Sequence, residues 1–316
     1  MYFPLLRGKM NELIALRDLA STIATSGSML PIIEPVKLNQ STRASFDRYV
    51  QANMPFVLVL NPRVGEAIGN VSEIQEQVVR RCLDEYDNYL PALYVGPSTT
   101  SRQLDGIDAA FDNLSLVMIY DGLPPARILE RLIQHTQVAY HVFLDGAISR
   151  ETIMRFPRER RALISDRYHK VKNADFPHDE LFSDKHKNIP NKDYVGFGDY
   201  SVVGAEYSEE GGPAYAVTLH HVYFRKQLGG DLHIKHFISD RTDSPVDPSG
   251  KYLEALNKLI AALPDLGDFN ITPTCDEYHT LHAAERSPGL GYAKRMAIKH
   301  HLELMLRLGA TTRRSR

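Results

Sequence analysis

The sequence predicts an α/β fold, a (β/α)8 TIM-type barrel, from three observations. Eight short apolar runs recur up to residue 197, roughly 20 to 35 residues apart, which is the length of one strand–helix unit. The runs are apolar almost throughout, as parallel strands buried on both faces require. Segments with helical periodicity stand between several of them. An open, doubly wound parallel sheet is the competing architecture.

The predicted strands are bounded by Pro, Gly or Asn, residues that mark turns. They span 2–6, 30–33, 56–60, 91–95, 114–120, 140–144, 162–165 and 194–197. Helical periodicity predicts helices over 11–20, 71–86, 100–111 and 125–136. Ser98 and Thr99 are N-cap candidates for the third helix, and Pro125 occupies a first-turn position of the fourth.

The pattern changes after residue 200. Alternating runs at 215–224 and 232–239 flank Gly229-Gly230 and predict a β-hairpin inserted after strand eight. Two helices follow, at 249–263, ending at Pro264, and at 290–308. We therefore expect one barrel domain over 1–309, with a hairpin insertion at about 214–239, and a disordered basic tail over 310–316.

Composition excludes several classes of protein. With 37 Lys plus Arg against 39 Asp plus Glu, the net charge is -2, which rules out an obligate polyanion coat but not a local basic groove. Cys82 and Cys275 are the only cysteines, too few for a disulfide scaffold or a cysteine-built zinc site. Neither a membrane-length apolar run nor a signal peptide is visible. We expect a soluble, cytoplasmic protein with no membrane partner.

The polar residues after each apolar run are the best candidates for function, because active sites of barrels lie at the carboxyl ends of the strands. These residues are, in strand order, Arg7 and Lys9, Glu34 and Lys37, Asn61 and Arg63, the Gly96-Pro97-Ser98 turn, Asp121, Asp145, Asp166 and Asp199. Carboxylates opposed by Arg and Lys suit a divalent cation bridged to a phosphate, or acid–base chemistry. Asp121 and Asp145 each precede glycine, so they are more simply turn residues.

These positions lead to specific assignments. Arg7, Lys9, Lys37 and Arg63 are predicted to bind an anionic ligand. Glu34, Asp166 and Asp199 are predicted to hold a divalent cation, Mg²⁺ or Mn²⁺, or to act as general acid and base, with Tyr200 and His169 as proton donors. Glu34 stands among apolar residues, where an unpaired charge is costly, so Arg7 or Lys9 is its expected partner. A purely structural ion pair would give the same pattern.

The usual signatures of other sites are absent from the sequence, which contains no G-x-G-x-x-G, Walker A or G-x-S-x-G motif. The hairpin carries four histidines: His220, His221, His233 and His236. Alternation places His220 and His221 on opposite faces, so a metal cluster would need the two arms to pair. Partly exposed strand histidines are the simpler interpretation. On the last helix, His301 is expected to face inward and His300 outward.

The segment 168–193 is long for a loop between strands and is rich in Lys and His. Because the loops after strands seven and eight often bind phosphate in barrels, we expect it to cover the barrel mouth, with a short helix at 178–187. A solvent-exposed excursion with balanced charge is the alternative.

Several segments resemble the "beta protein" family, a poorly characterised group found in bacteria and phages. They are MYFPLLRGKMNELIALRDLA at the start, LPIIEPVK at 30–37, SDRYHK at 165–170, GFGDYSVVGAEYSEEGG at 196–212, and the late KHHLELML. The resemblance covers nearly the whole chain and includes Arg7, Lys9, Glu34, Asp166, Asp199 and Tyr200. It implies a bacterial or phage context and names no reaction.

Two functions follow as hypotheses. The leading one is an enzyme-like barrel that binds a phosphate-bearing small molecule or nucleic acid, with metal-assisted hydrolysis of a phosphoester or nucleotide as the reaction class. The rival is a non-catalytic protein-binding component of a phage-defence or genetic-conflict system. Its partner, from a neighbouring gene, would dock on the hairpin 214–239, the segment 168–193 or the helices within 249–308.

Overall fold

The computed structural model describes the chain except residues 189–192, 210–211, 213–214, 227–228 and 315–316. The chain divides into two compact units. Unit 1 comprises Met1–Leu13, Ala20–Asp166 and Lys185–Tyr200, and unit 2 comprises Ile14–Leu19, Arg167–Asp184 and Ser201–Arg316. Within the described residues, no helix has the length and apolar character needed to cross a membrane.

Unit 1 is built on an eight-stranded parallel sheet in the order β1-β2-β3-β4-β5-β6-β7-β9. The strands are β1 (Leu5–Leu6), β2 (Ile32–Ile33), β3 (Phe56–Val59), β4 (Tyr89–Val95), β5 (Leu116–Tyr120), β6 (Val138–Leu144), β7 (Arg161–Ile164) and β9 (Gly196–Gly198). The Phe3 N–H donates to Phe197 O at 2.8 Å and the Leu5 N–H donates to Asp199 O at 2.9 Å. The last strand thus returns to the first, and the predicted barrel is confirmed over the open sheet.

Glycine allows this closure. A Cβ on Gly198 would lie 1.9 Å from Phe3 O, and one on Gly196 would lie 2.3 Å from Phe3 Cε2. Side chains at these positions would therefore push β9 away from the amino-terminal strand. The strand β9 carries Gly196 and Gly198 because the backbones approach so closely there.

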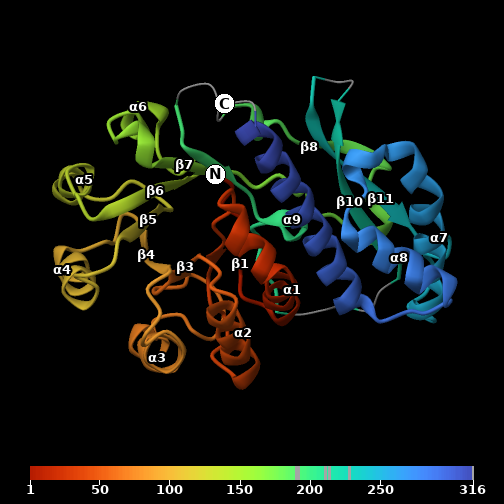
Figure 1. Ribbon diagram of the computed structural model, residues 1–316, viewed down its shortest axis with the longest axis horizontal. Helices are drawn as coiled ribbons and strands as arrows, with labels where there is room; N and C mark the ends of the chain where they lie inside the picture. Colours follow the sequence, from red (N-terminus) through yellow and green to blue (C-terminus); the bar gives the residue numbers. More distant parts are fainter. Residues whose placement is uncertain (189–192, 210–211, 213–214, 227–228, 315–316) are drawn as a thin grey trace. The chain divides into compact units, whose positions relative to one another are not determined.

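Helices alternate with the strands of unit 1. They are α1 (Met10–Ser26), α2 (Gln40–Gln51), α3 (Val71–Ile74, continued by a π-helical turn at Gln75–Arg80), α4 (Ser101–Ala110), α5 (Ala126–Ile133) and α6 (Arg150–Ile153). Figure 1 shows α2 to α6 outside the strands. The N-cap of α4 is Thr100, not Ser98 or Thr99, because Thr100 and Gln103 form a capping box.

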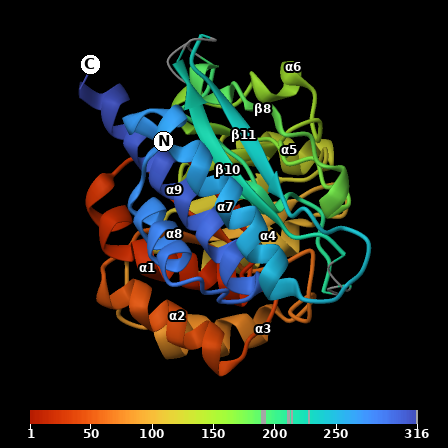
Figure 2. The ribbon, with the colours of Figure 1, turned by 90° about the vertical axis from the view of Figure 1, so that its right-hand side faces the viewer.

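Unit 2 contains a three-stranded antiparallel sheet in the order β10-β11-β8. Its strands are β8 (Asp179–Ser183), β10 (Thr218–Arg225) and β11 (Asp231–Ile238), and its helices are α7 (Pro248–Leu266), α8 (Pro273–Ala283) and α9 (Leu290–Arg314). Figure 2 shows the three helices beside the β10–β11 hairpin. Tyr252 and Leu256 of α7, Tyr278 of α8 and Met296 of α9 pack in one buried apolar cluster. The predicted hairpin after strand eight is confirmed.

Three local predictions were wrong. The helix expected at 178–187 is instead the strand β8, because this segment pairs with β11, and only a short 3-10 turn follows at Lys185–Asn188. The helix α7 does not stop at Pro264 and runs on to Leu266, since a proline so near the carboxyl end removes only one backbone hydrogen bond. The tail expected to be disordered is helical to Arg314, and residues 315–316 lie outside the described part.

Candidate functional site

The centre of the candidate site is a buried ion pair between the first two strand ends of unit 1. Arg7 follows β1 and Glu34 follows β2, and Arg7 Nη1 contacts Glu34 Oε2. The Glu34 side chain is fully buried and that of Arg7 is 11% exposed. Burial lowers the pKa of Arg7, but the combined effects of Glu34, Tyr94 and Tyr200 outweigh it and the pKa is raised overall. The guanidinium is therefore charged, and the predicted pairing is present.

Two further donors fix the Glu34 carboxylate. The Tyr94 hydroxyl near the end of β4 donates to Glu34 Oε2 at 2.9 Å, and the backbone N–H of Arg63 donates to Oε1 at 2.6 Å. Burial, then the charge of Glu34, raises the pKa of Tyr94 well above its ordinary value, so the hydroxyl keeps its proton. Both carboxylate oxygens are engaged within the protein, which suits an orienting role better than a metal-ligating one.

Arg63 connects this pair to the fifth strand. Its Nε lies 2.7 Å from Asp121 Oδ2, and its guanidinium carbon lies 5.4 Å from the centroid of the Tyr94 ring. Gly96 leaves room for the carboxylate, because a Cβ there would lie 2.4 Å from Asp121 Oδ1. The Arg63 side chain is 40% exposed. Among the described residues, its two terminal nitrogens have no hydrogen-bond partner.

Tyr200, directly after β9, completes the group. The guanidinium carbon of Arg7 lies 5.2 Å from the Tyr200 ring centroid, a cation–π distance. Burial raises the pKa of Tyr200 to about 12; Arg7 opposes this rise. The charges of Glu34, Asp166 and Asp121 also contribute to this raised pKa. At neutral pH Tyr200 is thus a hydrogen-bond donor.

We call this group the mouth cluster; it consists of Arg7, Glu34, Arg63, Tyr94, Asp121 and Tyr200. Its members come from the carboxyl ends of β1, β2, β3, β4, β5 and β9. Each guanidinium is held by a carboxylate and faces a tyrosine ring, so the cations are fixed in direction. Such an arrangement can bind an oxyanion through the two terminal nitrogens of Arg63.

The other predicted site residues lie elsewhere. Asp199 is buried and accepts a hydrogen bond from the Tyr2 hydroxyl at 2.6 Å. Lys37 pairs with Glu66 at 2.7 Å on the surface, and Lys9 is the N-cap residue of α1. His169 belongs to unit 2, where its Nδ1 lies 3.4 Å from Glu180 Oε2. Asp166 influences the mouth cluster because its negative charge contributes to the raised pKa of Tyr200.

Sequence reasoning missed Tyr94 and set Asp121 aside as a turn residue. Tyr94 stands inside an apolar run, and only its polar tip near a strand end could have drawn attention to it. Asp121 followed by glycine is ambiguous in sequence, because a turn requires the same residues. Its contact with Arg63 depends on the neighbouring turn at Gly96.

In unit 2, pairing of the hairpin arms joins two of its histidines. His220 lies opposite His236, with their Nδ1 atoms 2.7 Å apart. The Tyr168 hydroxyl lies 3.0 Å from His220 Nε2, and Glu180 Oε1 lies 3.1 Å from His236 Nε2. This chain of hydrogen bonds satisfies the buried rings without a ligand.

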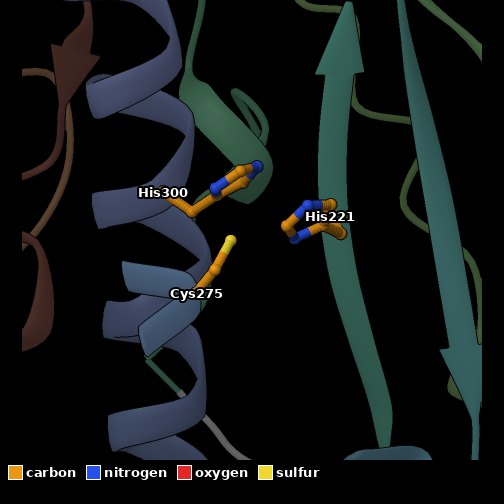
Figure 3. A group of neighbouring side chains, drawn as sticks. All are labelled: His221, Cys275 and His300. Carbon is orange, nitrogen blue, oxygen red and sulfur yellow. The ribbon is translucent and has the colours of Figure 1, made fainter. Parts of the chain in front are cut away.

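His221 points the other way, as alternation predicted, and joins Cys275 and His300 in unit 2 (Figure 3). One ligand atom from each residue lies within 4.8 Å of the others, and all three residues are fully buried. Within the described residues, these three form the one group of His, Cys, Asp or Glu side chains whose ligand atoms lie close enough together to hold a metal ion. The expectation that His300 faces outward was wrong, since α9 is covered on that side. Mg²⁺ or Mn²⁺ at Glu34, Asp166 and Asp199 stays a prediction.

Comparisons of the chain with known proteins found no relative. No protein-family model matches the chain, and neither curated proteins nor solved structures gave a match. The resemblance to the "beta protein" family and the phage context therefore stay predictions.

Proposed function

We propose that the mouth cluster binds a polar, phosphate-bearing ligand, with Arg63 as the main anion contact. The observation that supports the proposal is the set of contacts that the Arg63 side chain makes. Its Nε is held by Asp121 and its face by Tyr94, while its terminal nitrogens have no partner among the described residues. A guanidinium fixed in this way loses little conformational freedom when it forms a bidentate contact to phosphate.

The charges of the cluster favour a cation beside the ligand. Two guanidinium groups, Arg7 and Arg63, face the carboxylates of Glu34 and Asp121, and Asp166 acts on Tyr200 from nearby. These two positive and three negative side chains make the region negative already. A phosphate dianion would add to this charge, and Mg²⁺ or Mn²⁺ would offset part of the excess. We therefore propose metal-assisted hydrolysis of a phosphoester or nucleotide as the reaction class.

Thermal unfolding tests the binding. Inorganic phosphate and a panel of nucleotides are added, each with and without Mg²⁺ or Mn²⁺. A ligand at 100 times its Kd stabilises the protein by about 2.7 kcal/mol, so we expect one combination to raise the Tm by several degrees. Arg63→Ala should remove the rise. Arg80→Ala, which removes an exposed arginine paired with Glu76, should keep it.

Phosphate release measured on the same panel tests the reaction. We expect release that requires the metal and is lost in Arg63→Ala. Binding without release would leave a binding protein and contradict the hydrolase. If no combination shifts the Tm of the parent protein, the binding proposal is wrong as well.

A further inference from the structure

The second site of interest is the buried group in unit 2, which is separate from the mouth cluster. His221 lies on β10, Cys275 in the first turn of α8, and His300 on α9. Figure 3 shows the two rings face to face with the Cys275 sulfur directed toward them. The ring centroids are 3.7 Å apart and the planes are 17° from parallel. Three elements distant in sequence thus bring nitrogen and sulfur atoms within 4.8 Å of one another.

His221 is the feature that a structural role leaves unexplained. The residue is fully buried, and neither Nδ1 nor Nε2 has a hydrogen-bond partner within the described residues. A neutral imidazole carries one donor and one acceptor, and burying both without partners is costly. An apolar side chain in this position would avoid the cost. Burial, and then the charge of His300, lowers the pKa of His221 well below its ordinary value, so the ring is neutral and able to ligate a metal.

His300 is held by a hydrogen bond at each ring nitrogen. Its Nε2 lies 2.7 Å from Val222 O, and its Nδ1 lies 2.9 Å from Thr272 Oγ1. Because a carbonyl only accepts, Nε2 carries the proton, and the Nδ1 lone pair accepts a hydrogen bond from the Thr272 hydroxyl, which a metal ion at Nδ1 would displace. A backbone carbonyl behind one ring nitrogen is a common second partner of metal-bound histidine. Burial lowers the pKa of His300 to about 4.

Cys275 supplies the third donor. Its backbone N–H donates to Thr272 O at 2.8 Å. Among the described residues, its sulfur has only long contacts of 4.0 Å, to Thr272 Oγ1 and Asn270 O. Burial raises the pKa of this thiol, and the nearby carboxylate of Glu303 raises it further. The thiol is therefore protonated until a cation displaces its proton.

We propose that His221, Cys275 and His300 form a binding site for a borderline-soft transition-metal ion, Zn²⁺ or Cu⁺. Two imidazoles and one thiolate are the donors that these ions prefer over oxygen ligands. In a tetrahedral site, bonds of these types place the donor atoms about 3.5 Å apart. Ion binding would therefore require the donor atoms, now up to 4.8 Å apart, to approach by about 1 Å. The His221 ring would also have to turn out of its stack on His300, about an outer torsion that is broad.

The surroundings complete the site. Glu303 lies one helical turn beyond His300 on α9, is buried, and accepts the Thr274 N–H of α8 at 3.0 Å. With the Cys275 thiolate, it gives two negative charges, which balance Zn²⁺. Three protein donors leave the fourth position of a tetrahedral Zn²⁺ to a water molecule or another small ligand, and the bound ion would tie β10, α8 and α9 together. This proposal does not depend on the function proposed for the mouth cluster.

The test uses the full chain after removal of metal by a chelator. Zn²⁺, Cu⁺ under reducing conditions, and Co²⁺ as a spectroscopic probe are added separately. We expect one equivalent of Zn²⁺ or Cu⁺ to be retained per chain, and one proton to be released for each ion bound, from the Cys275 thiol. The retained ion identifies which of the two metals the site takes. Co²⁺ should give a thiolate-to-cobalt charge-transfer band.

Matched variants locate the site. Cys275→Ser and His221→Asn should abolish retention and the cobalt band. Cys82→Ser and His279→Asn, which alter the other cysteine and an exposed histidine of α8, should keep both. If the Cys275 variant does not fold, the parent protein still decides by stoichiometry and proton release. Binding of none of the three ions, or equal retention by Cys275→Ser, would overturn the proposal.

Discussion

Glu34→Gln should lower the free energy of unfolding of unit 1 by about 3 kcal/mol. The change removes the negative charge but leaves Arg7, only 11% exposed, beside a neutral amide. Breaking a buried ion pair from one side costs about 3 to 5 kcal/mol. We expect the low end because the one oxygen of glutamine can still accept a hydrogen bond from either the Tyr94 hydroxyl or the Arg63 N–H.

A double-mutant cycle separates the ion pair from its surroundings. Arg7→Met alone leaves the Glu34 charge buried and should also be destabilising, whereas the double variant removes both charges. We expect a coupling energy of about 2 kcal/mol between the two sites. Urea unfolding at neutral pH, followed by tyrosine fluorescence and circular dichroism, measures it, with the transition of each unit fitted separately.

An exposed ion pair provides the control. Glu66→Gln breaks the contact with Lys37, whose side chain is 44% exposed, and should cost no more than about 1 kcal/mol. If the losses from Glu34→Gln and Arg7→Met simply add to within about 0.5 kcal/mol, the two charges do not act as a buried pair and the reasoning fails.

Two further predictions concern a glycine and the buried histidines. Gly96→Ala would place a Cβ 2.4 Å from Asp121 Oδ1, so it should displace this carboxylate and weaken ligand binding in the thermal-shift assay. As a control, Gly106→Ala, in α4 with open space around it, should stabilise the folded protein by about 0.5 to 1 kcal/mol. Equal behaviour of the two variants would contradict this reasoning. Burial holds the pKa of His220 at about 3 and that of His300 at about 4, against about 6.5 in the unfolded chain. The unfolded state therefore binds more protons below about pH 6.5, so the stability of unit 2 should be complete above that pH and fall toward pH 4, by up to about 1.4 kcal/mol per pH unit for each histidine. Urea unfolding of chelator-treated protein between pH 7 and 4 measures this, and a flat profile would refute it.

The barrel could be predicted because its strands carry their own signal. A strand buried on both faces must be apolar along its length whatever its neighbours are, so runs such as 56–60 and 114–120 identify it locally. Segment 178–187 is different. Its strand β8 exists because it pairs with β11, where Asp179 meets His233 and Glu180 meets His236. Such a strand has no pattern of its own in the sequence.

The mouth cluster was predicted in part for a related reason. Arg7, Glu34 and Arg63 follow strands directly, and the barrel fold alone brings strand ends together. The direction of each side chain depends on contacts across the sheet, so Asp199 meets Tyr2 instead. Tyr94, within an apolar strand, becomes part of the site only through its contact with Glu34.

By itself, the sequence determined that eight buried strands form a parallel barrel, that a hairpin follows, and that charged residues stand at the strand ends. Only the tertiary structure decided which of those charges meet, and that His221, Cys275 and His300 share one buried point. The physical reason is the distance along the chain over which each effect acts. Periodicity and burial act within a few residues along the chain, whereas contacts between a strand and two helices depend on how those elements pack.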